Sequence, residues 1–536
     1  MEPAFDYIIV GGGSAGCAVA GRLAESGKYR VALLEAGPSG HGLWTRMPIG
    51  YGKTFYEPRV NWMYQTAPVP GLGGRTSYWP RGKVLGGSST INAMVYSRGQ
   101  AADFEEWAAL GNVGWGWSDV LAAYRRMEDH DLGAGPWHGA GGPLHVSTID
   151  QDAHPLTAIF LQAAAEMGLP FSPDLNGETI EGAGHYQITT RKGLRESAAT
   201  AYLKPRPNLY ISTETQATRL LLDGRRVSGV ATMEKGRQRD FFAAKEVIVA
   251  AGSIGSPHLL QLSGIGPAGL LKRVGIEVAL DVPAVGQNLQ DHLCYDHVYK
   301  SRRPSLNDAL GPWMGKLRVG LQYLLFRKGP LALSLNQGGG YYRSRPGLAA
   351  PDIQLYFSPL SYERAQTPRV RALMSPDPFP GFSTSVSPCK PKSAGHLAIT
   401  SPDWRVAPEI HPNYLSDPFD VAQLLDGARY LRRLAATPSF AAVIEAEMKP
   451  GGAAQSDADL IADIQARCYS VFHPVGTCRM GPDPANSVVD PQLRLHGLAG
   501  LRVADASIFP VITSGNTNAP AIMVGERAAE FVLGAP

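Results

Sequence analysis

The chain opens with an apolar run and then a stretch of small residues, a pattern that predicts a strand followed by a helix. Residues 5–10 are almost continuously apolar, as in a strand buried on both faces of a parallel sheet. Residues 15–24 are rich in alanine and glycine, which lets a helix pack closely against that sheet. Residues 30–35 predict a second strand that ends in an acidic residue. We therefore expect a strand–helix–strand unit at the front of the chain.

Further apolar patterns predict strands in the middle of the chain. The runs at 209–212 and 226–232 indicate the two strands of a hairpin, and 247–252 indicates a buried strand that returns to the first sheet. Apolar and polar residues alternate at 352–357 and 396–400, which predicts two half-buried strands.

Helical spacing and a last returning strand complete the pattern. Apolar residues recur at helical intervals in 119–127 and 420–436. Residues 501–507 predict a strand that leads to a final helix from about Ala519. Four tryptophans lie around the first of these helices, and packing in the core explains them better than ligand contact: Trp107, Trp115, Trp117 and Trp137.

The break after the first strand carries the first chemical signal. Gly11, Gly13 and Gly16 allow a tight turn, close approach of a pyrophosphate and close helix–strand packing, respectively. The helix that follows offers free N–H groups and a positive dipole end to that pyrophosphate. Glu35, at the end of the second strand, is spaced to accept hydrogen bonds from ribose hydroxyls. The unit predicts a bound dinucleotide, with both FAD and NAD open at this point.

Composition narrows the class of protein. The 536 residues exceed one ordinary domain, so we expect several units. Charged residues make up 18% of the chain, against roughly 25% in typical soluble domains, which indicates a large interior. A net charge of +3, with no basic run that contains aromatic residues, gives no support for nucleic-acid binding.

Cysteine spacing and hydropathy indicate the cellular compartment of the protein. The five cysteines show no C-x-x-C spacing, which argues against a zinc site or a disulfide framework and favours a reducing environment. The apolar segment at 317–333 is interrupted by a basic and proline-containing stretch, so no membrane span is expected. We expect a cytoplasmic protein without a signal peptide, and peripheral membrane attachment stays open.

Two stretches after the first unit also suggest a site. Residues 41–74 are rich in glycine, proline and aromatic residues, and a lid over a site and an ordinary long loop explain them equally well. Residues 80–96 contain a Gly-Gly-Ser-Ser turn, which gives backbone N–H groups access to a planar or charged ligand, and a purely structural turn explains this motif taken alone equally well.

Together these motifs resemble the glucose-methanol-choline (GMC) oxidoreductases, flavoenzymes that bind FAD. The first unit is followed by one family motif at 82–89 and a second at 252–266, and the likeness continues at 285–292, 408–418 and through the C-terminal third. The pattern is most similar to choline dehydrogenase-like and aryl-alcohol oxidising members. The resemblance implies FAD rather than NAD.

The resemblance also implies the fold, a mixed α/β architecture. A Rossmann-like FAD-binding domain would comprise residues 1–150, 205–292 and 466–536. A substrate-binding domain, built on an antiparallel sheet flanked by helices, would comprise residues 151–204 and 293–465.

Contacts with FAD follow from the matching positions. Ala217 replaces the usual valine at a backbone contact with adenine, a departure of little consequence. Ile91 stands where members with covalent FAD carry histidine, so we expect non-covalent FAD. The expected cofactor-binding residues are Gly11, Gly13, Ser14, Ala15, Gly16, Glu35, Ala36, Arg81, Val84, Gly86, Gly87, Ser88, Asn92, Ala93, Met94, Val95, Ala217, Asp505, Ala506, Asn516, Thr517 and Asn518.

The family pattern also places the chemistry. A base must take the hydroxyl proton of an alcohol while a hydrogen-bond partner holds the oxygen, and an imidazole suits the base role. The resemblance assigns these tasks to His473 and Asn516, whereas Asn518 either contacts the flavin or caps the last helix. Phe472 and Tyr96 are expected in the substrate pocket.

These inferences predict FAD-dependent oxidation of a primary alcohol to an aldehyde by hydride transfer to flavin N5. Phe472 favours an apolar or aromatic alcohol over a small cation. The electron acceptor, oxygen or another redox partner, and a homodimeric state stay open. Two alternatives also remain, a hydroxynitrile lyase that keeps FAD without net redox chemistry and a non-catalytic FAD-binding scaffold.

Overall fold

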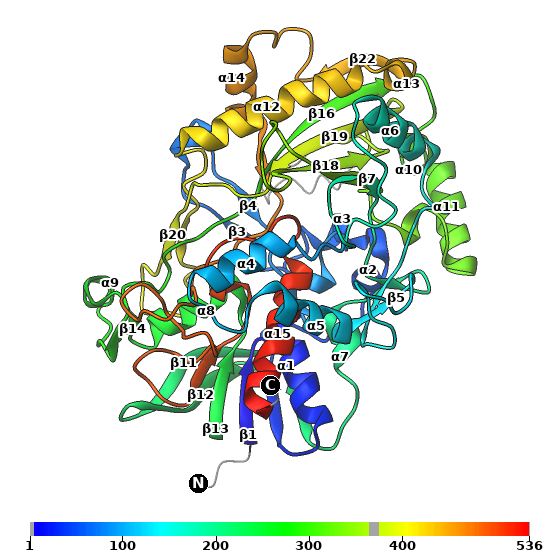
Figure 1. Ribbon diagram of the computed structural model, residues 1–536. Helices are drawn as coiled ribbons and strands as arrows, with labels where there is room; N and C mark the ends of the chain where they lie inside the picture. The colour runs from blue at the N-terminus through cyan, green and yellow to red at the C-terminus, as the bar shows by residue number, and fades with distance from the viewer. Residues whose placement is uncertain (1–4, 364–374, 535–536) are drawn as a thin grey trace.

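A computed structural model describes residues 5–363 and 375–534 of the chain. Figure 1 shows two sheets, one in the lower half with α1 (Ser14–Glu25) and α15 (Asn518–Leu533), and one in the upper half with α6 (Pro155–Glu166) and α12 (Pro418–Ala435). The space between the two sheets contains the functional site described below.

The first sheet has seven strands and is mainly parallel around its centre. β2, β1 and the end of β13 run parallel, as the apolar runs predict, and β24 joins β13 from the far end of the chain. Across the sheet the order is β10 (Leu209–Ser212), β2 (Val31–Leu34), β1 (Phe5–Val10), β13 (Arg237–Val249), β12 (Arg226–Glu234) and β11 (Thr215–Asp223), with β24 (Leu501–Val503) beside β13.

The predicted hairpin between residues 209–212 and 226–232 is wrong. β10 pairs in parallel with β2 at the sheet edge, and the hairpin partner of β12 is β11. β11 was overlooked because polar residues and arginine interrupt its apolar pattern. The short run of β10 is compatible with either pairing, so its partner is decided by tertiary contact.

The second sheet is antiparallel and also has seven strands. Its order is β22 (Ile444–Lys449), β16 (Leu293–Ser301), β19 (Gly381–Pro388), β18 (Ile353–Ser358), β17 (Gly338–Tyr342) and β7 (Gly182–His185), with β23 (Tyr469–Ser470) beside β16. In Figure 1, α12 and α6 lie above this sheet, and Ile353, Leu355 and Phe357 pack into the core on that side.

The alternation in β18 has a different cause from the one expected. The strand is buried on both faces rather than half-buried. Tyr356 and Ser358 point away from the helices and line a cavity between the two sheets. Gln354, on the same face of the strand, donates to Asn516 in the wall of that cavity. The polar positions therefore mark a site, and the strand has no solvent-facing side.

The remaining elements connect and cover these sheets. The helices predicted at 119–127 and 420–436 are confirmed as α5 and α12, and the strand predicted at 396–400 is confirmed as β20 in a two-stranded sheet with β21. The other helices and short strands are α2 (Leu43–Arg46), α3 (Tyr51–Thr54), α4 (Ala101–Ala109), α5 (Trp117–Met127), α7 (Ala198–Tyr202), α8 (Gly252–Leu262), α9 (Ala268–Arg273), α10 (Leu306–Leu310), α11 (Trp313–Phe326), α13 (Pro438–Ala441), α14 (Asp457–Arg467), β3 (Tyr64–Gln65), β4 (Tyr78–Trp79), β5 (Glu128–His130), β6 (Leu144–Val146), β8 (Thr190–Arg191), β9 (Leu194–Arg195), β14 (Ile265–Gly266), β15 (Leu280–Asp281), β20 (His396–Ala398) and β21 (Glu409–His411).

We propose that the chain is divided into a discontinuous FAD-binding domain and a discontinuous substrate-binding domain. All strands of the first sheet come from the ranges assigned to the FAD-binding domain. One strand of the second sheet departs from this division. β23 lies in the range 466–536, assigned to the FAD-binding domain, but it pairs with β16 of the second sheet. Within the described residues, no helix is long and apolar enough to cross a membrane, and no group of three or more histidine, cysteine or acidic side chains is placed to hold a metal ion.

Candidate active site

A cavity of about 460 Å³ lies between the two sheets. It runs from the ends of β1 and β2 to the inner faces of β18 and β19, so both halves of the chain contribute to its wall. The volume is in the range that binds a small ligand or part of a cofactor.

Three helices begin at this cavity, and in none of them does the residue before the first turn cap the helix with its own side chain. At α8 the N–H of Gly252 donates to Asp505 instead. The residues that precede the first turns of α1, α8 and α15 are Gly13, Ala251 and Thr517, and all three line the cavity. The first N–H groups of a helix have no partner within the helix, and its dipole is positive at that end. This end of the cavity therefore suits an anionic group such as a pyrophosphate.

The two glycine motifs meet in the structure. Gly11 has a φ of +104°, and a Cβ atom on Gly16 would lie 2.0 Å from the Gly11 oxygen, so both glycines are required by the packing of β1 against α1. Gly87 has a φ of +54°, and a Cβ there would lie 2.7 Å from Gly13 Cα. The Gly86 N–H also donates to Gly12 at 2.7 Å. The second motif thus forms one wall of the same cradle.

Glu35 is buried at the end of β2 beside this cradle. Its two carboxylate oxygens accept hydrogen bonds from the N–H groups of Gly12 at 2.9 Å and Gly37 at 2.8 Å. Burial raises the pKa of Glu35 to about 7 in spite of these bonds. Ala36 and Ala217 lie on the same part of the wall. The cradle, the three helix ends and this carboxyl group fit an adenine dinucleotide such as FAD.

The structure brings most of the residues expected to bind the cofactor to this cavity. Its wall includes Gly11, Gly13, Ser14, Ala15, Glu35, Ala36, Arg81, Gly87, Ser88, Asn92, Ala93, Met94, Val95, Ala217, Asp505, Ala506, Asn516, Thr517 and Asn518. Gly16, Val84 and Gly86 lie behind the wall, where they support the two loops. Thr517 precedes α15, and Asn518 accepts a hydrogen bond from Ser14 at 2.8 Å.

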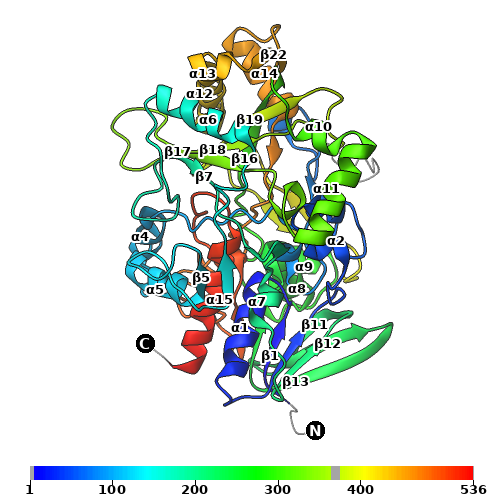
Figure 2. The same cartoon turned by 90° about the vertical axis from the view of Figure 1, so that its right-hand side faces the viewer.

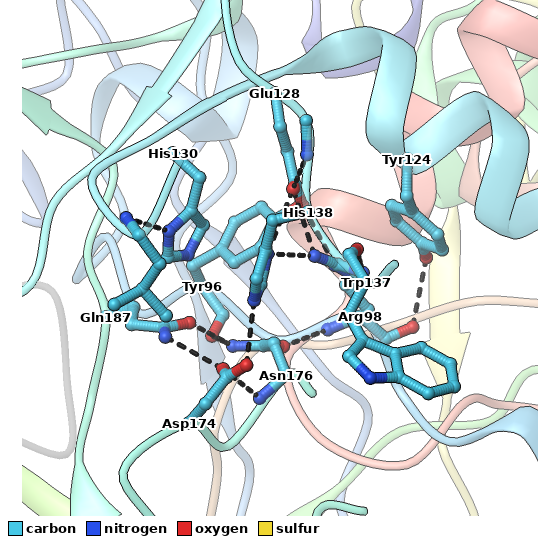
Figure 3. Close-up of polar contacts among 12 residues, drawn as sticks. Tyr96, Arg98, Tyr124, Glu128, His130, Trp137, His138, Asp174, Asn176 and Gln187 are labelled. Carbon is cyan, nitrogen blue, oxygen red and sulfur yellow. Dashed lines mark hydrogen bonds and ion pairs between the residues drawn. The ribbon is translucent and has the colours of Figure 1, made fainter. Parts of the chain in front are cut away.

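Tyr96 is the expected pocket residue that the structure places elsewhere. Its hydroxyl donates to Glu128 in a buried cluster with Arg98 and His138 (Figure 3). Its neighbour Val95 lines the cavity, and consecutive side chains of an extended segment point in opposite directions. The prediction that Tyr96 lines the substrate pocket is therefore wrong.

His473 and Asn516 lie next to each other in the wall of the cavity. Asn516 Nδ2 is 3.1 Å from His473 Nε2. The backbone at His473 is fixed because its N–H donates to Asp291 at 2.7 Å, and Arg81 donates to the carbonyl of Phe472 at 2.7 Å. Phe472 has a φ of +67°, a strained conformation that these contacts maintain.

A chain of hydrogen bonds fixes the tautomer of His473. His292 Nε2 lies 2.9 Å from the Cys389 carbonyl, which only accepts, so Nε2 carries the proton and Nδ1 of the neutral ring accepts. His473 Nδ1 is 3.1 Å from His292 Nδ1 and must donate to it. His473 Nε2 is left with its lone pair, toward which Asn516 donates.

Both imidazoles are neutral near pH 7. Burial lowers the pKa of His292 to about 4. Burial, with the nearby His292 and the positive charge of Arg81, lowers the pKa of His473 well below its ordinary value. The lone pair at His473 Nε2 is thus present over the neutral and mildly acidic range.

The amide of Asn516 is oriented from β18. Gln354 accepts a hydrogen bond from the Tyr356 hydroxyl at 2.7 Å, which places its amide nitrogen toward Asn516. That nitrogen donates to Asn516 Oδ1 at 3.3 Å. The Asn516 Nδ2 donor is therefore directed toward His473.

Aromatic side chains form much of the wall near His473. Four come from the stretch 41–74, whose role the sequence left open: Tyr51, Phe55, Trp62 and Tyr64. The rings of Phe55 and Phe472 meet edge to face with centroids 5.6 Å apart. The stretch is thus part of the cavity wall and not an ordinary loop.

Sequence reasoning overlooked His292 and Gln354 as parts of this site. His292 lies in a family-like stretch, 285–292, but carried no assigned task. Gln354 was visible only as a polar position in an alternating strand. Cys478 is buried and does not line the cavity, so it is a packed thiol.

Comparison with known proteins gives the family. Models of the GMC oxidoreductase N- and C-terminal regions match residues 5–294 and 391–525. The chain is 40% identical to an alcohol dehydrogenase [acceptor] of Pseudomonas putida, over 99% of this chain and 96% of that one. It is 41% identical to mitochondrial choline dehydrogenase of Homo sapiens, over 99% and 90% of the two chains. The structure is similar to pyridoxine 4-oxidase from Mesorbium loti, with a TM-score of 0.86 at 32% identity and 98% coverage of each chain. The chain therefore belongs to the GMC oxidoreductase family, as its motifs predicted.

Proposed function

We propose that this enzyme oxidises a primary alcohol to an aldehyde with FAD as the hydride acceptor, His473 as the base and Asn516 as the partner of the substrate oxygen. The observation that supports this role is the hydrogen-bond chain that leaves a lone pair on His473 Nε2, 3.1 Å from the Asn516 amide donor, in the wall of the cavity. Removal of the hydroxyl proton by a positioned base is what hydride release from an alcohol requires.

In this proposal the alcohol oxygen lies between the two side chains. The hydroxyl donates to His473 Nε2 and accepts from Asn516 Nδ2, replacing the direct contact between them. His473 takes the proton at Nε2 while its Nδ1–H stays bonded to His292. When bound, FAD supplies flavin N5 as the acceptor of the hydride.

The charge around His473 favours an uncharged substrate. Of the described residues that line the cavity, the acidic ones are Glu35 and Asp505. Glu35 belongs to the cradle, and Asp505 is occupied by the N–H of Gly252 at 2.8 Å and other donors. Of the charged residues in the cavity wall, the one close to His473 is the cation Arg81, whereas Asp291 accepts from the His473 backbone N–H and does not line the cavity. With its aromatic wall, this end suits an apolar or aromatic alcohol better than a quaternary ammonium compound.

We also propose that FAD is bound without a covalent link. Ile91 lines the cavity at the position where family members with covalent FAD carry histidine, and its hydrocarbon side chain forms no bond to a flavin. Acid precipitation of the holoenzyme should release the yellow cofactor into the supernatant, whereas a covalent flavin would stay with the pellet.

Anaerobic mixing with substrate tests the proposed reaction. Benzyl alcohol should bleach the flavin absorbance and yield benzaldehyde, with a kcat/KM at least about tenfold above that for choline. A panel of alcohols assayed with oxygen and with an artificial acceptor would then identify the electron acceptor. A flavin that no alcohol reduces would contradict the proposal and favour a hydroxynitrile lyase or a non-catalytic FAD-binding scaffold.

A further inference from the structure

One side of helix α11 is apolar and exposed at the surface of the molecule. Seven large apolar side chains of α11 are between 50% and 73% exposed: Trp313, Met314, Leu317, Leu321, Leu324, Leu325 and Phe326. Positions 314, 317, 321 and 324 recur at intervals of three and four, so they form a stripe along one side of the helix. Exposed apolar clusters of this kind mark interaction surfaces in folded proteins.

The opposite side of α11 attaches the helix to the protein. Val319 and Tyr323 are its buried residues. Tyr323 packs with Met47 and Ala332, and its hydroxyl donates to the Gly193 carbonyl at 3.1 Å. Because the attached side is opposite to the apolar stripe, the stripe points away from the body of the molecule.

All charges on and directly after α11 are positive. Lys316 and Arg318 lie within the helix, Arg327 and Lys328 follow it, and all four are exposed. The helix sequence contains no aspartate or glutamate. An apolar face with tryptophan, leucine and phenylalanine, flanked by lysine and arginine, is the composition of helices that lie in a membrane interface.

The short helix α2 extends this surface. Its residues Leu43 and Trp44 are 53% and 40% exposed, and α2 lies beside α11 in Figures 1 and 2. Met47, directly after α2, packs on Tyr323 of α11. The two helices are therefore joined by this packing contact.

We propose that α11 and α2 form a docking surface that inserts into the interface of a lipid bilayer with anionic headgroups. The positive charges around the stripe complement such headgroups. A second copy of the chain fits the surface less well, because two-fold pairing of α11 would bring two sets of positive charges into one interface with no acidic residue of the helix to balance them. The attachment does not depend on the reaction proposed above.

The surface is also connected to the cavity. The chain passes from α2 through residues 48–50 to Tyr51, and from α11 through residues 330–332 to Leu335. Tyr51 and Leu335 both line the cavity wall. Docking would thus hold the aromatic end of the site close to the bilayer, where apolar alcohols concentrate.

Vesicle binding tests this proposal. The FAD-loaded, full-length protein should sediment with phosphatidylcholine vesicles that contain phosphatidylglycerol, and about tenfold less with pure phosphatidylcholine. The double variant Leu317→Glu/Leu321→Glu should lower the partition coefficient at least about tenfold on both vesicle types, since it removes apolar insertion. Lys316→Glu/Arg318→Glu should lower it about tenfold on the anionic vesicles alone.

A matched control distinguishes the surface from general hydrophobicity. Leu110 and Val113 are 49% and 83% exposed at the end of α4, on the opposite side from α11 in Figure 2. Leu110→Glu/Val113→Glu should bind vesicles within about twofold of the wild type. Wild-type protein that stays in the supernatant with both vesicle types would overturn the proposal. So would a wild-type dimer in sedimentation velocity that Leu317→Glu/Leu321→Glu dissociates, because that result assigns the surface to a second copy.

Discussion

Two buried hydrogen-bond networks in this molecule contain histidine, and they differ in how readily their imidazoles are protonated. His473 contacts His292 and an amide, and burial keeps both imidazoles neutral. His138 lies between Asp174 at 2.8 Å and Glu128 at 3.1 Å (Figure 3). Although burial opposes it, the hydrogen bonds to these carboxylates raise the pKa of His138.

The difference depends on the groups that reach each imidazole. A carboxylate is also close to His473, but Asp291 accepts its backbone N–H and not a ring proton. The ring is therefore left without a counter-ion, which favours the neutral base. The other network joins cations to carboxylates, since Arg98 donates to Glu128 at 2.9 Å, and it links segments of the chain. We therefore expect loss of catalysis from changes in the first network and loss of stability from changes in the second.

The largest effect is expected from His473→Ala. Loss of the base should lower kcat with benzyl alcohol about 10²–10⁴-fold, measured by steady-state and anaerobic flavin-reduction kinetics. Flavin content and the urea midpoint should stay close to the wild-type values. Flavin reduction at a near-normal rate would show that His473 is not the base.

Glu128→Gln, in the second network, should lower the stability of the protein and leave catalysis nearly unchanged. The substitution leaves Arg98 and His138 without their buried carboxylate, which costs about 3–5 kcal/mol of unfolding free energy. Urea denaturation measures this loss, and kcat per bound flavin should change little. As a control, Asp457→Asn removes one of the two acidic partners of Arg429 in a solvent-exposed ion pair and should cost at most about 1 kcal/mol. Equal destabilisation by both variants would contradict the assigned importance of the buried cluster.

A smaller catalytic effect is expected when the partner of His473 is changed. His292→Leu removes the acceptor for Nδ1–H, so the tautomer is no longer fixed and kcat should fall about 10–100-fold. His292→Asn can present an oxygen near the former Nδ1 position and should recover part of that loss. If the two variants have the same kcat, with flavin content unchanged, the proposed positioning role of His292 is incorrect.

The smallest expected change is in the pH profile. An ordinary histidine base would lose activity as the pH falls through about 6.5. Because the pKa of His473 is lowered, its neutral form persists below that value, and kcat/KM should stay level from about pH 8 to pH 6. A decline centred near pH 6.5 would mean that the imidazole is less buried in the working enzyme.

The cofactor half of the molecule could be predicted from sequence because its signals are local. The turn at Gly11, the adjacent helix start and Glu35 lie close together along the chain, and each has a conformational or chemical requirement that its residue type reveals. The family resemblance then supplied His473 and Asn516, which no local pattern identifies.

The remaining features depend on contacts between distant segments. The tautomer of His473 follows from His292 and the Cys389 carbonyl, and nothing in the sequence near His473 indicates either partner. Tyr96 was assigned to the pocket because the sequence does not show to which side of an extended segment each side chain points. Similarly, β10 pairs with β2 because of packing that a four-residue run does not specify.

The contact between the first and last helices has a consequence for synthesis of the protein. α15 packs against α1 so closely that a Cβ on Gly525 would lie 2.5 Å from the Ala15 oxygen, and Asn518 accepts from Ser14. β24 likewise completes the first sheet. The cradle at Gly11–Ser14 is therefore closed by residues about 500 positions later, and a chain synthesised only as far as α14 holds an open half-site. We therefore expect stable flavin capture only once α15 has been made, so a variant truncated before Asn518 should be colourless.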